Sequence, residues 1–262
     1  MKRIPITLLL LVMFFNAVVA QKINGKQIKE KSIEATRVKG TEGLATITTI
    51  NENGQTRIRE LASITKLYDG GKTEKKLLKF LQPADVKGTG FLTFDYNKED
   101  DDKWIYMPAL RKTRRIINSE NAKSFMGTEF SYADMTLPNV DEYHYKMIGE
   151  ENILGQICYV IEERPINEEV ENENGFSKKI TYINKENFVS IKSVYFDLYG
   201  DKEKIMIVKE YKELDKTNHK YRLTNIEIKN IQNGRKSTNV IKEIKYNPGL
   251  PDSYFTTRYI ER

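Results

Sequence analysis

Strand-length segments recur along this sequence at short intervals, and this pattern restricts the possible folds more than any other feature. Between residues 41 and 246 the segments are rich in β-branched and aromatic residues, and turn pairs such as Asn53-Gly54 and Asn233-Gly234 separate them. Short connections of this kind are typical of antiparallel strands, because parallel strands need much longer crossovers. The sequence therefore predicts a mainly β (α+β) fold, built on an incomplete antiparallel barrel or a strongly curved sheet.

The first twenty residues have the organisation of a secretory signal peptide. Two basic residues precede an apolar run over residues 6–15, and small residues lead to Ala20. The run is short for the hydrocarbon core of a bilayer, which favours cleavage after Ala20 over a membrane anchor. Gln21 would then be the first residue, so the expected product is exported and is not a lipoprotein. No compositional linker interrupts residues 21–262, and we expect them to form one domain.

The residues that commonly carry catalysis are few in this chain. Cys158 is the sole cysteine, and His144 and His219 are the only histidines, neither of them at metal-binding spacing from another ligand type. The motifs of nucleotide-binding, serine-hydrolase and zinc-protease sites are absent. Carboxylate pairs are too numerous to argue for a glycosidase or against one. We expect no enzymatic activity, no metal and no cofactor.

The charge pattern bears on the choice of partner. The formal net charge is +6, and the basic residues are spread among acidic ones. This mixture is typical of a solvated surface rather than a nucleic-acid interface. We therefore expect no nucleic-acid partner, and we expect a monomer.

The stretch from residue 80 to residue 135 departs from the regular strand pattern. A strand is expected at residues 91–96, followed by a long strand over residues 104–117 that Pro108 weakens in the middle. Between residues 119 and 138 the strand period is lost and large apolar side chains gather. These side chains are Phe125, Met126, Phe130, Tyr132 and Met135. Because methionine repacks around varied apolar shapes, we interpret this segment as a lid over an open sheet, with an ordinary core helix as the alternative.

Two runs of like charge flank this segment on its N-terminal side. The acidic run at residues 99–102 lacks the ligand spacing of a calcium loop and is interpreted as a solvated hairpin tip. The basic run at residues 111–115 fits a solvated strand edge, docking to an acidic partner or lipid head groups, or an arginine that holds a lid. Arg114 and Arg115 are the candidates for such lid or partner contacts.

Four blocks of this sequence, read together, resemble the LolA-like outer-membrane lipoprotein-sorting proteins. The blocks are KFLQPADVKGTGFLTFDY, DDKWIYMPALRKTRRI, SFMGTEFSYADM and YNPGLPDSYFTTRYIER. The resemblance extends from about residue 41 to residue 262. It implies a periplasmic protein in which an incomplete antiparallel barrel and a helical lid enclose an apolar cavity for lipoprotein acyl chains. The short, weakly amphipathic helix expected in residues 21–39 departs from the best-studied carriers.

These observations lead to one functional hypothesis and one alternative. The hypothesis is a periplasmic carrier that shelters acyl chains of lipoproteins or another lipid, with an inner-membrane transporter or exporter as donor and an outer-membrane acceptor. The alternative is a lipid- or protein-binding sensor, or an adaptor subunit of an exporter of the resistance-nodulation-division (RND) type. The concave face is expected to carry Leu92, Phe94, Trp104 and Tyr106. The cover over it is expected to be formed by Phe125, Met126, Phe130 and Met135.

Overall fold

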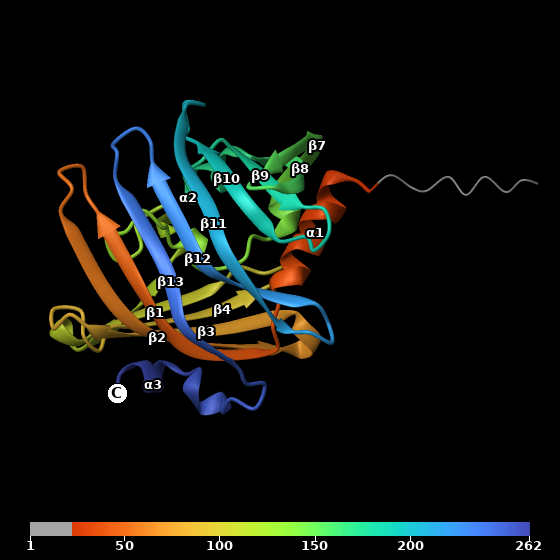
Figure 1. The fold of residues 1–262 in the computed structure, drawn as a ribbon. Helices are drawn as coiled ribbons and strands as arrows, with labels where there is room; N and C mark the ends of the chain where they lie inside the picture. The colour runs from red at the N-terminus through yellow and green to blue at the C-terminus, as the bar shows by residue number, and fades with distance from the viewer. Residues whose placement is uncertain (1–22) are drawn as a thin grey trace, which may run out of the picture.

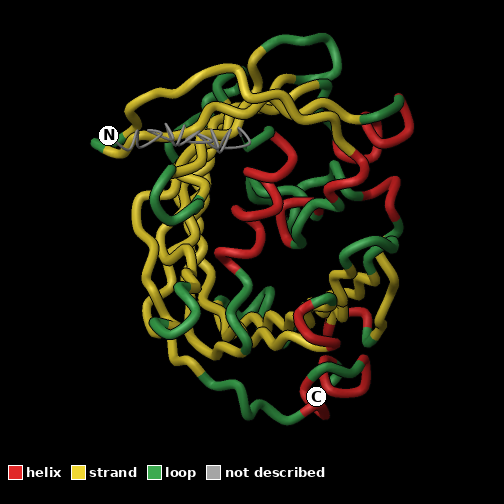
Figure 2. The backbone as a smooth tube through the Cα atoms, turned by 90° about the vertical axis from the view of Figure 1, so that its right-hand side faces the viewer, coloured by secondary structure: helices red, strands yellow, loops and turns green. Residues whose placement is uncertain are grey.

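The computed structural model describes residues 23–262, so the predicted signal peptide lies outside the described residues. One 13-stranded sheet runs in the order β6-β5-β4-β3-β2-β1-β13-β12-β11-β10-β9-β8-β7. The strands are β1 (Gly40–Ile50), β2 (Thr56–Tyr68), β3 (Thr73–Gln82), β4 (Gly90–Tyr96), β5 (Asp102–Met107), β6 (Lys112–Ile116), β7 (Tyr143–Ile153), β8 (Gln156–Pro165), β9 (Lys178–Asn184), β10 (Ser190–Phe196), β11 (Lys202–Asp215), β12 (Lys220–Asn230) and β13 (Lys236–Tyr246). The sheet is antiparallel and curves without closing (Figures 1 and 2), which confirms the predicted fold class.

The strand order has a direct consequence for the open side of the sheet. Each strand pairs with its neighbours in sequence, except that β1 also pairs with β13 and joins the two halves. The two edge strands, β6 and β7, are therefore consecutive in the chain. The connection between them, residues 117–142, has to travel from one edge of the curved sheet to the other. It contains the short 3-10 turns η3 (Asn118–Glu120), η4 (Ala133–Met135) and η5 (Val140–Glu142).

Helix α1 (Gly25–Thr36) confirms the short helix expected in residues 21–39 and lies inside the curve (Figures 1 and 2). Asn24 begins the helix by accepting a hydrogen bond from the amide of Gln27 (2.9 Å), and the Gln27 side chain accepts one from the amide of Asn24 (3.0 Å). Ile28 is fully buried against Ile161 and Ile183. None of the helices in the described part of the chain is long and apolar enough to cross a bilayer.

The C-terminal segment, residues 247–262, packs on the outer, convex face of the sheet. It contains η6 (Asp252–Tyr254) and α3 (Thr257–Ile260), and Figure 2 shows it outside the curve. Leu250, Phe255 and Ile260 are buried against Leu77 and Leu92 of the sheet. The tail is thus docked on the body of the protein.

One long strand was expected at residues 104–117, and this prediction is wrong. The chain folds back on itself there, and β5 and β6 form an antiparallel hairpin joined by the 3-10 turn η2 (Pro108–Leu110). Pro108 starts the turn, where its fixed φ is favourable, and Arg111 leaves it with φ 47°. The proline thus ends one strand instead of weakening the middle of a longer one.

The polar segment at residues 167–174 forms a short helix, α2 (Glu168–Asn174). The Asn167 side chain caps the helix by accepting a hydrogen bond from the amide of Val170 at 2.9 Å. Gly175 ends it with φ 72°, a conformation that glycine adopts without steric cost. The helix has only 7 residues and one buried side chain, Val170, so its apolar periodicity is too weak to read from sequence.

Candidate ligand-binding site

Residues 119–138, hereafter the aromatic loop, lie over the concave face of the sheet at β3, β4 and β5. The Phe125 side chain is fully buried, and its ring centroid lies 5.0 Å from that of Phe91 and 6.1 Å from that of Phe80. The ring of Tyr132 lies 5.8 Å from both Phe91 and Phe125. The sheet residues of this cluster are Ala45, Ile47, Leu61, Leu78, Phe80, Phe91, Ile105 and Ile116. The loop thus fills the apolar part of the concave face with its own aromatic side chains.

The backbone of the aromatic loop is hydrogen-bonded mainly to itself. The Phe125 amide donates to the Phe130 carbonyl at 2.7 Å, and the Tyr132 amide donates to the Lys123 carbonyl at 3.1 Å. A tight turn at Met126 (φ 52°) and Gly127 (φ 74°) reverses the chain between them. These bonds hold the turn together independently of the sheet, whereas the amides of Glu129 and Leu137 donate to side chains of the sheet.

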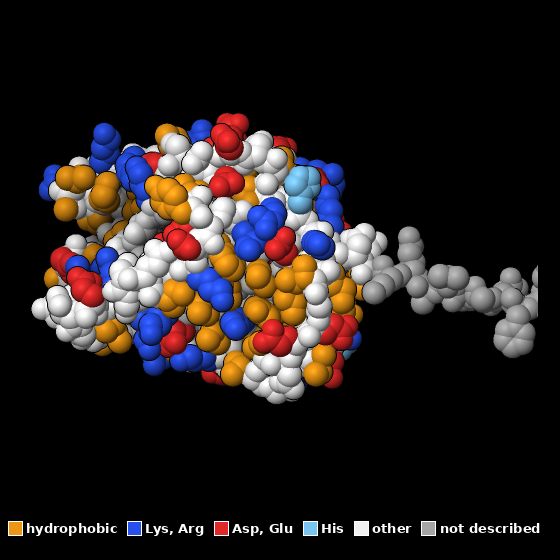
Figure 3. Space-filling model, turned by 90° about the horizontal axis from the view of Figure 1, so that it is seen from above, with side chains coloured by type: hydrophobic (Ala, Val, Ile, Leu, Met, Phe, Trp, Pro, Cys, Tyr) orange, Lys and Arg blue, Asp and Glu red, His pale blue; other side chains and the backbone are white. Residues whose placement is uncertain are grey.

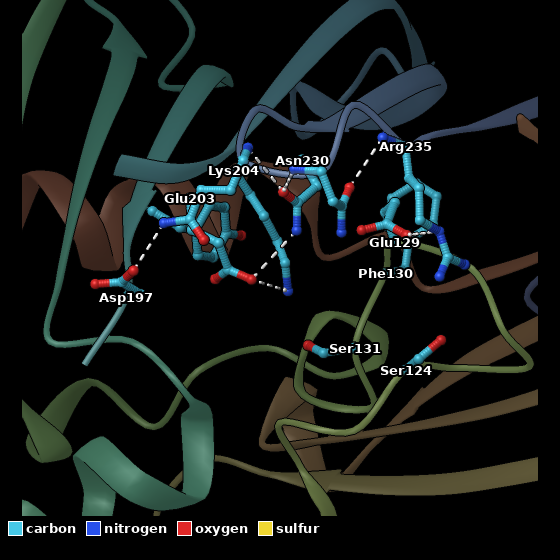
Figure 4. A network of polar contacts seen from close by, with 12 residues as sticks. Ser124, Glu129, Phe130, Ser131, Asp197, Glu203, Lys204, Asn230 and Arg235 are labelled. Carbon is cyan, nitrogen blue, oxygen red and sulfur yellow. Dashed lines mark hydrogen bonds and ion pairs between the residues drawn. The ribbon is translucent and has the colours of Figure 1, made fainter. Parts of the chain in front are cut away.

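Polar contacts at the tip of the aromatic loop attach it to β13 and the turn before it. Glu129 forms an ion pair with Arg235 (2.9 Å), and its amide donates to the Ser237 hydroxyl (3.0 Å). Figure 4 shows Arg235 reaching Glu129, with a separate group formed by Glu203, Lys204 and Asn230 beside it. Glu129 and Ser237 are both buried, so these contacts are shielded from solvent.

A second set of polar contacts fixes the C-terminal end of the aromatic loop. The Lys76 ammonium donates to the Met135 carbonyl, and the Tyr195 hydroxyl donates to the Asp134 carboxylate at 3.1 Å. The amide of Leu137 donates to the carboxylate of Asp95 at 2.6 Å. The tip and the C-terminal end of the aromatic loop are thus attached through side chains of the sheet and its turns.

Asp95 is an attachment group with a strongly raised pKa. It is 2% exposed, and burial, followed by the charges of Asp101 and Glu74, raises its pKa to about 8. The hydrogen bond from the Leu137 amide acts in the opposite direction. A buried carboxyl with acidic neighbours favours its neutral form, so the end of the loop is bound to a group whose charge depends on pH.

The predicted cover residues come together on the concave face. Phe125 and Phe130 are buried there, and Met126 and Met135 are half-buried against the same apolar cluster. The segment contains short 3-10 turns instead of the core helix that was considered as the alternative. Whether these side chains contact a ligand stays a prediction.

The four side chains expected on the concave face lie on the opposite, convex face. Leu92 is fully buried beneath the C-terminal segment, and Phe94, Trp104 and Tyr106 are half-buried in the same cluster. The side chains of neighbouring residues in a strand point to opposite faces, and here it is Phe91 and Ile105 that point inward. The predicted face was therefore wrong in both strands, because the inward-pointing side chains belong to the residues next to the predicted ones. Any contact between these four residues and a ligand remains untested.

Arg114 and Arg115 have different partners. Arg114 donates to the Glu120 carboxylate at 2.8 Å, so it contacts the start of the aromatic loop through a carboxylate and not through a backbone carbonyl. Arg115 pairs with Asp102 on the neighbouring strand at 2.5 Å. On the face seen in Figure 3, lysine and arginine side chains lie among acidic and hydrophobic ones, without forming one continuous basic surface.

A cleft of about 310 Å³ lies on the other side of the aromatic loop, toward α2, β10 and β11. Its lining is largely polar and includes Asp134, Glu142, Lys179, Glu203 and Lys204. Removing the hydration of these groups would oppose the binding of an acyl chain. The apolar surface beneath the loop differs from this cleft, and the loop's own side chains occupy it.

A buried ionic group forms one wall of the cleft and attaches α1 to the sheet. Lys29 of α1 and Lys179 of β9 both contact the Glu163 carboxylate, at 3.0 and 3.2 Å. Burial alone would raise the pKa of Glu163, but Lys179 and Lys29 outweigh it and lower the pKa to about 2. Burial lowers the pKa of Lys29 to about 8 in spite of the carboxylate. The carboxylate is thus held charged between two ammonium groups.

Comparisons with known proteins agree with this architecture. A protein-family model with the description "-like: Uncharacterized protein" matches residues 72–262. A DUF1329 family protein from Desulfovibrio piger is 27% identical, with a TM-score of 0.82 over 90% of this chain and 97% of that one. The chain belongs to the family that this model describes.

Two further solved structures show the same LolA-like fold. An outer membrane lipoprotein-sorting protein domain from Vibrio parahaemolyticus has a TM-score of 0.82 and 24% identity, over 91% of this chain and 98% of that one. A LolA superfamily protein from Nitrosomonas europaea has a TM-score of 0.67 and 19% identity, over 90% and 99%. No curated protein matches the sequence.

Within this LolA-like fold, the groups that attach the aromatic loop could not be identified from the sequence. Asp95 stands out as the one charged residue of β4, but Lys76 and Arg235 lie beside other charged residues, and nothing in their spacing distinguishes them. Arg59, a buried charge on β2, was missed for the same reason. A faint signal exists at Arg59, because it shares strand parity with the buried Leu61.

Proposed function

We propose that the mature protein is a periplasmic carrier that shelters the acyl chains of lipoproteins or of a similar lipid. The supporting observation is the apolar concave face, which is covered by a loop whose backbone hydrogen bonds are internal. The related solved structures, one described as a lipoprotein-sorting protein domain and one as a LolA superfamily protein, agree with a lipid-binding role in the periplasm. Binding and release then need no catalytic group.

The energetics of an acyl chain explain why a carrier of this form is useful. Burial of apolar groups is worth about 0.8 kcal/mol per CH₂, so a chain of about 16 carbons in water carries a cost on the order of 12 kcal/mol. Free transit of such a chain across an aqueous compartment is negligible. A protein that hides the chain removes this barrier.

The aromatic loop supplies the means of release. When the loop is closed, Phe125, Phe130 and Tyr132 occupy the surface that an acyl chain would occupy. Binding then exchanges one set of apolar contacts for another, so the net gain is much smaller than the full cost of transfer from water. A carrier with a modest net affinity can pass its cargo from an inner-membrane donor to an outer-membrane acceptor.

A reversible lock on the loop tests this proposal. Glu129 and Ser237 are in direct contact, and we would replace both with cysteine in a Cys158→Ser background. Oxidation would tie the loop tip to β13, and reduction would release it. We expect the oxidised protein to lose binding of a fluorescent fatty acid and the same protein to regain it after reduction.

The matched control is the Cys158→Ser protein treated in the same way, which should bind the probe under both conditions. Counting free thiols establishes that the disulfide has formed. Equal binding by the locked and reduced forms would show that the acyl site does not lie beneath the aromatic loop.

A further inference from the structure

Arg59 of β2 carries a buried charge that has no visible counterpart. The residue is 4% exposed, and its Nε and Nη1 atoms have no hydrogen-bond partner among residues 23–262. Its strand register pairs it with Ile47 of β1, whose side chain belongs to the apolar cluster of the concave face. Leu61, two residues further along β2, belongs to the same cluster. The guanidinium is therefore directed to the face that the aromatic loop covers.

Every other buried cation in the described part of the chain has at least one polar partner, although the Nε of Arg37 has none. Lys29 and Lys179 share the Glu163 carboxylate, and Lys103 pairs with Asp101 at 3.3 Å. Arg37 donates to the Gly71 carbonyl. For Arg59, neither an ion pair nor a side-chain hydrogen bond exists within the described residues.

An unpaired buried charge is unfavourable, and proteins normally place a counter-charge or hydrogen-bond acceptors beside it. Burial, and next the charge of Arg57, lower the pKa of Arg59, which shows that its surroundings oppose the cation. The closed state thus contains a group that an anion would stabilise. A guanidinium binds the paired oxygens of a carboxylate or phosphate through two parallel hydrogen bonds.

The surroundings of Arg59 match an amphipathic ligand. The tip of the aromatic loop lies over it, because a Cβ placed on Gly127 would be 4.0 Å from Arg59 Nη2. Ile47 and Leu61 lie beside it on the sheet and continue into the cluster around Phe125. A charged site therefore adjoins an apolar surface, and one movement of the loop would uncover both.

A second unsatisfied polar group lies in the same cross-strand row. Asn239 of β13 pairs in register with Ile47 on the side opposite Arg59, and its Oδ1 also has no hydrogen-bond partner in the described chain. An amide can present either its oxygen or its nitrogen, and the nitrogen can donate to an anion. Arg59 and Asn239 thus flank one apolar position of the concave face.

We propose that Arg59 binds the anionic head group, a carboxylate or a phosphate, of a lipid whose acyl chain occupies the concave face beneath the aromatic loop. This inference rests on the proposed carrier function and narrows its cargo. A fully acylated lipoprotein N-terminus has no negative charge at the lipid, so the site selects anionic lipids within that wider class.

The test compares ligands that share one acyl chain and differ in the head group. A fluorescent fatty acid, the corresponding alcohol and the corresponding lysophosphatidic acid are titrated into the wild-type protein, Arg59→Met and Arg57→Met. We expect the wild type to prefer the anionic probes over the alcohol by about 10- to 100-fold, the range of a hydrogen bond to a charged group. Arg59→Met should bind all three alike, and Arg57→Met should keep the preference.

Arg57 is a suitable control because it lies two residues away on the same strand but is half-exposed and paired with Asp85. The preference between the two anionic probes identifies the head group as carboxylate or phosphate. Equal binding of the acid and the alcohol by the wild type would overturn the proposal, even if Arg59→Met failed to fold. A preference that survives in Arg59→Met would also overturn it. Failure of all three probes to bind would refute the carrier function itself, and this inference with it.

Discussion

Replacement of Phe125 by alanine is expected to increase the apparent affinity for an acyl ligand. Phe125 is fully buried in the closed arrangement, against the rings of Phe91, Phe80 and Tyr132. Truncation of a fully buried phenylalanine costs about 3–5 kcal/mol. These contacts exist only when the loop is closed, so the substitution destabilises the closed form relative to the open one.

The size of the effect follows from a two-state equilibrium between closed and open loops. A change of about 3–5 kcal/mol alters the ratio of open to closed forms by about two to three and a half orders of magnitude. The apparent dissociation constant equals the intrinsic one divided by the open fraction, so it should decrease by the same factor until the open form predominates. A side chain that merely contacted the ligand would give the opposite sign.

The assay is a titration of Phe125→Ala and the wild type with one fluorescent fatty acid under identical conditions. Ile191→Ala is the control, because Ile191 is also fully buried but belongs to a separate apolar cluster with Cys158 and Val189. It should lose stability without a gain in affinity. Weaker or unchanged binding by a folded Phe125→Ala protein would refute the view that this side chain competes with the ligand.

Three other predictions concern stability, pH and the face of the sheet. Glu163→Gln leaves two buried ammonium groups without a carboxylate and should destabilise the protein by about 3–5 kcal/mol in denaturant unfolding. Glu162→Gln, whose side chain is partly exposed and paired with the exposed Arg164, should cost about 1 kcal/mol or less. Folding raises the pKa of Asp95 from 3.8 to about 8, so the protonated carboxyl stabilises the folded protein. This stabilisation is complete below pH 3.8 and is lost as the pH rises through about 8. The melting temperature of the wild type should therefore fall relative to that of Asp95→Asn over this range, and parallel curves would contradict the assignment. Trp104→Asp should leave acyl-probe affinity unchanged because Trp104 is on the convex face, and loss of binding in a folded variant would show that this face takes part.

The strands and turns were accessible from the sequence because each is encoded locally. Period-two patterns, and turn residues such as Asn53-Gly54, determine a strand and its hairpin without reference to the rest of the chain. Loss of that period also located the aromatic loop correctly. The strand order then required no long-range prediction, since every pairing except that of β1 with β13 joins sequence neighbours.

The inner and outer faces of β4 and β5 could not be distinguished from the sequence, for a physical reason. Phe91 and Leu92 are both fully buried, the first beneath the aromatic loop and the second beneath the C-terminal segment. A strand covered on both sides has no polar face to set the register. Tertiary packing alone decides which of its side chains point inward.

The attachment of the aromatic loop was hidden from sequence analysis for a different reason. Arg235 and Glu129 are 106 positions apart in a chain in which charged residues make up 31% of the composition. Pairings of this kind depend on where the connection between the two edge strands crosses the sheet. They become visible only when the curvature of the sheet is known.

Hydrogen exchange of the aromatic loop, measured with and without a saturating fatty acid, tests its displacement most directly. The informative amides are those of Glu129 and Leu137, which donate to the Ser237 hydroxyl and the Asp95 carboxylate of the sheet in the closed state. If the acyl chain replaces the loop, bound ligand should speed exchange at these amides while the strands beneath them keep their protection. Bound ligand that leaves residues 119–138 as protected as before would contradict a site on the concave face.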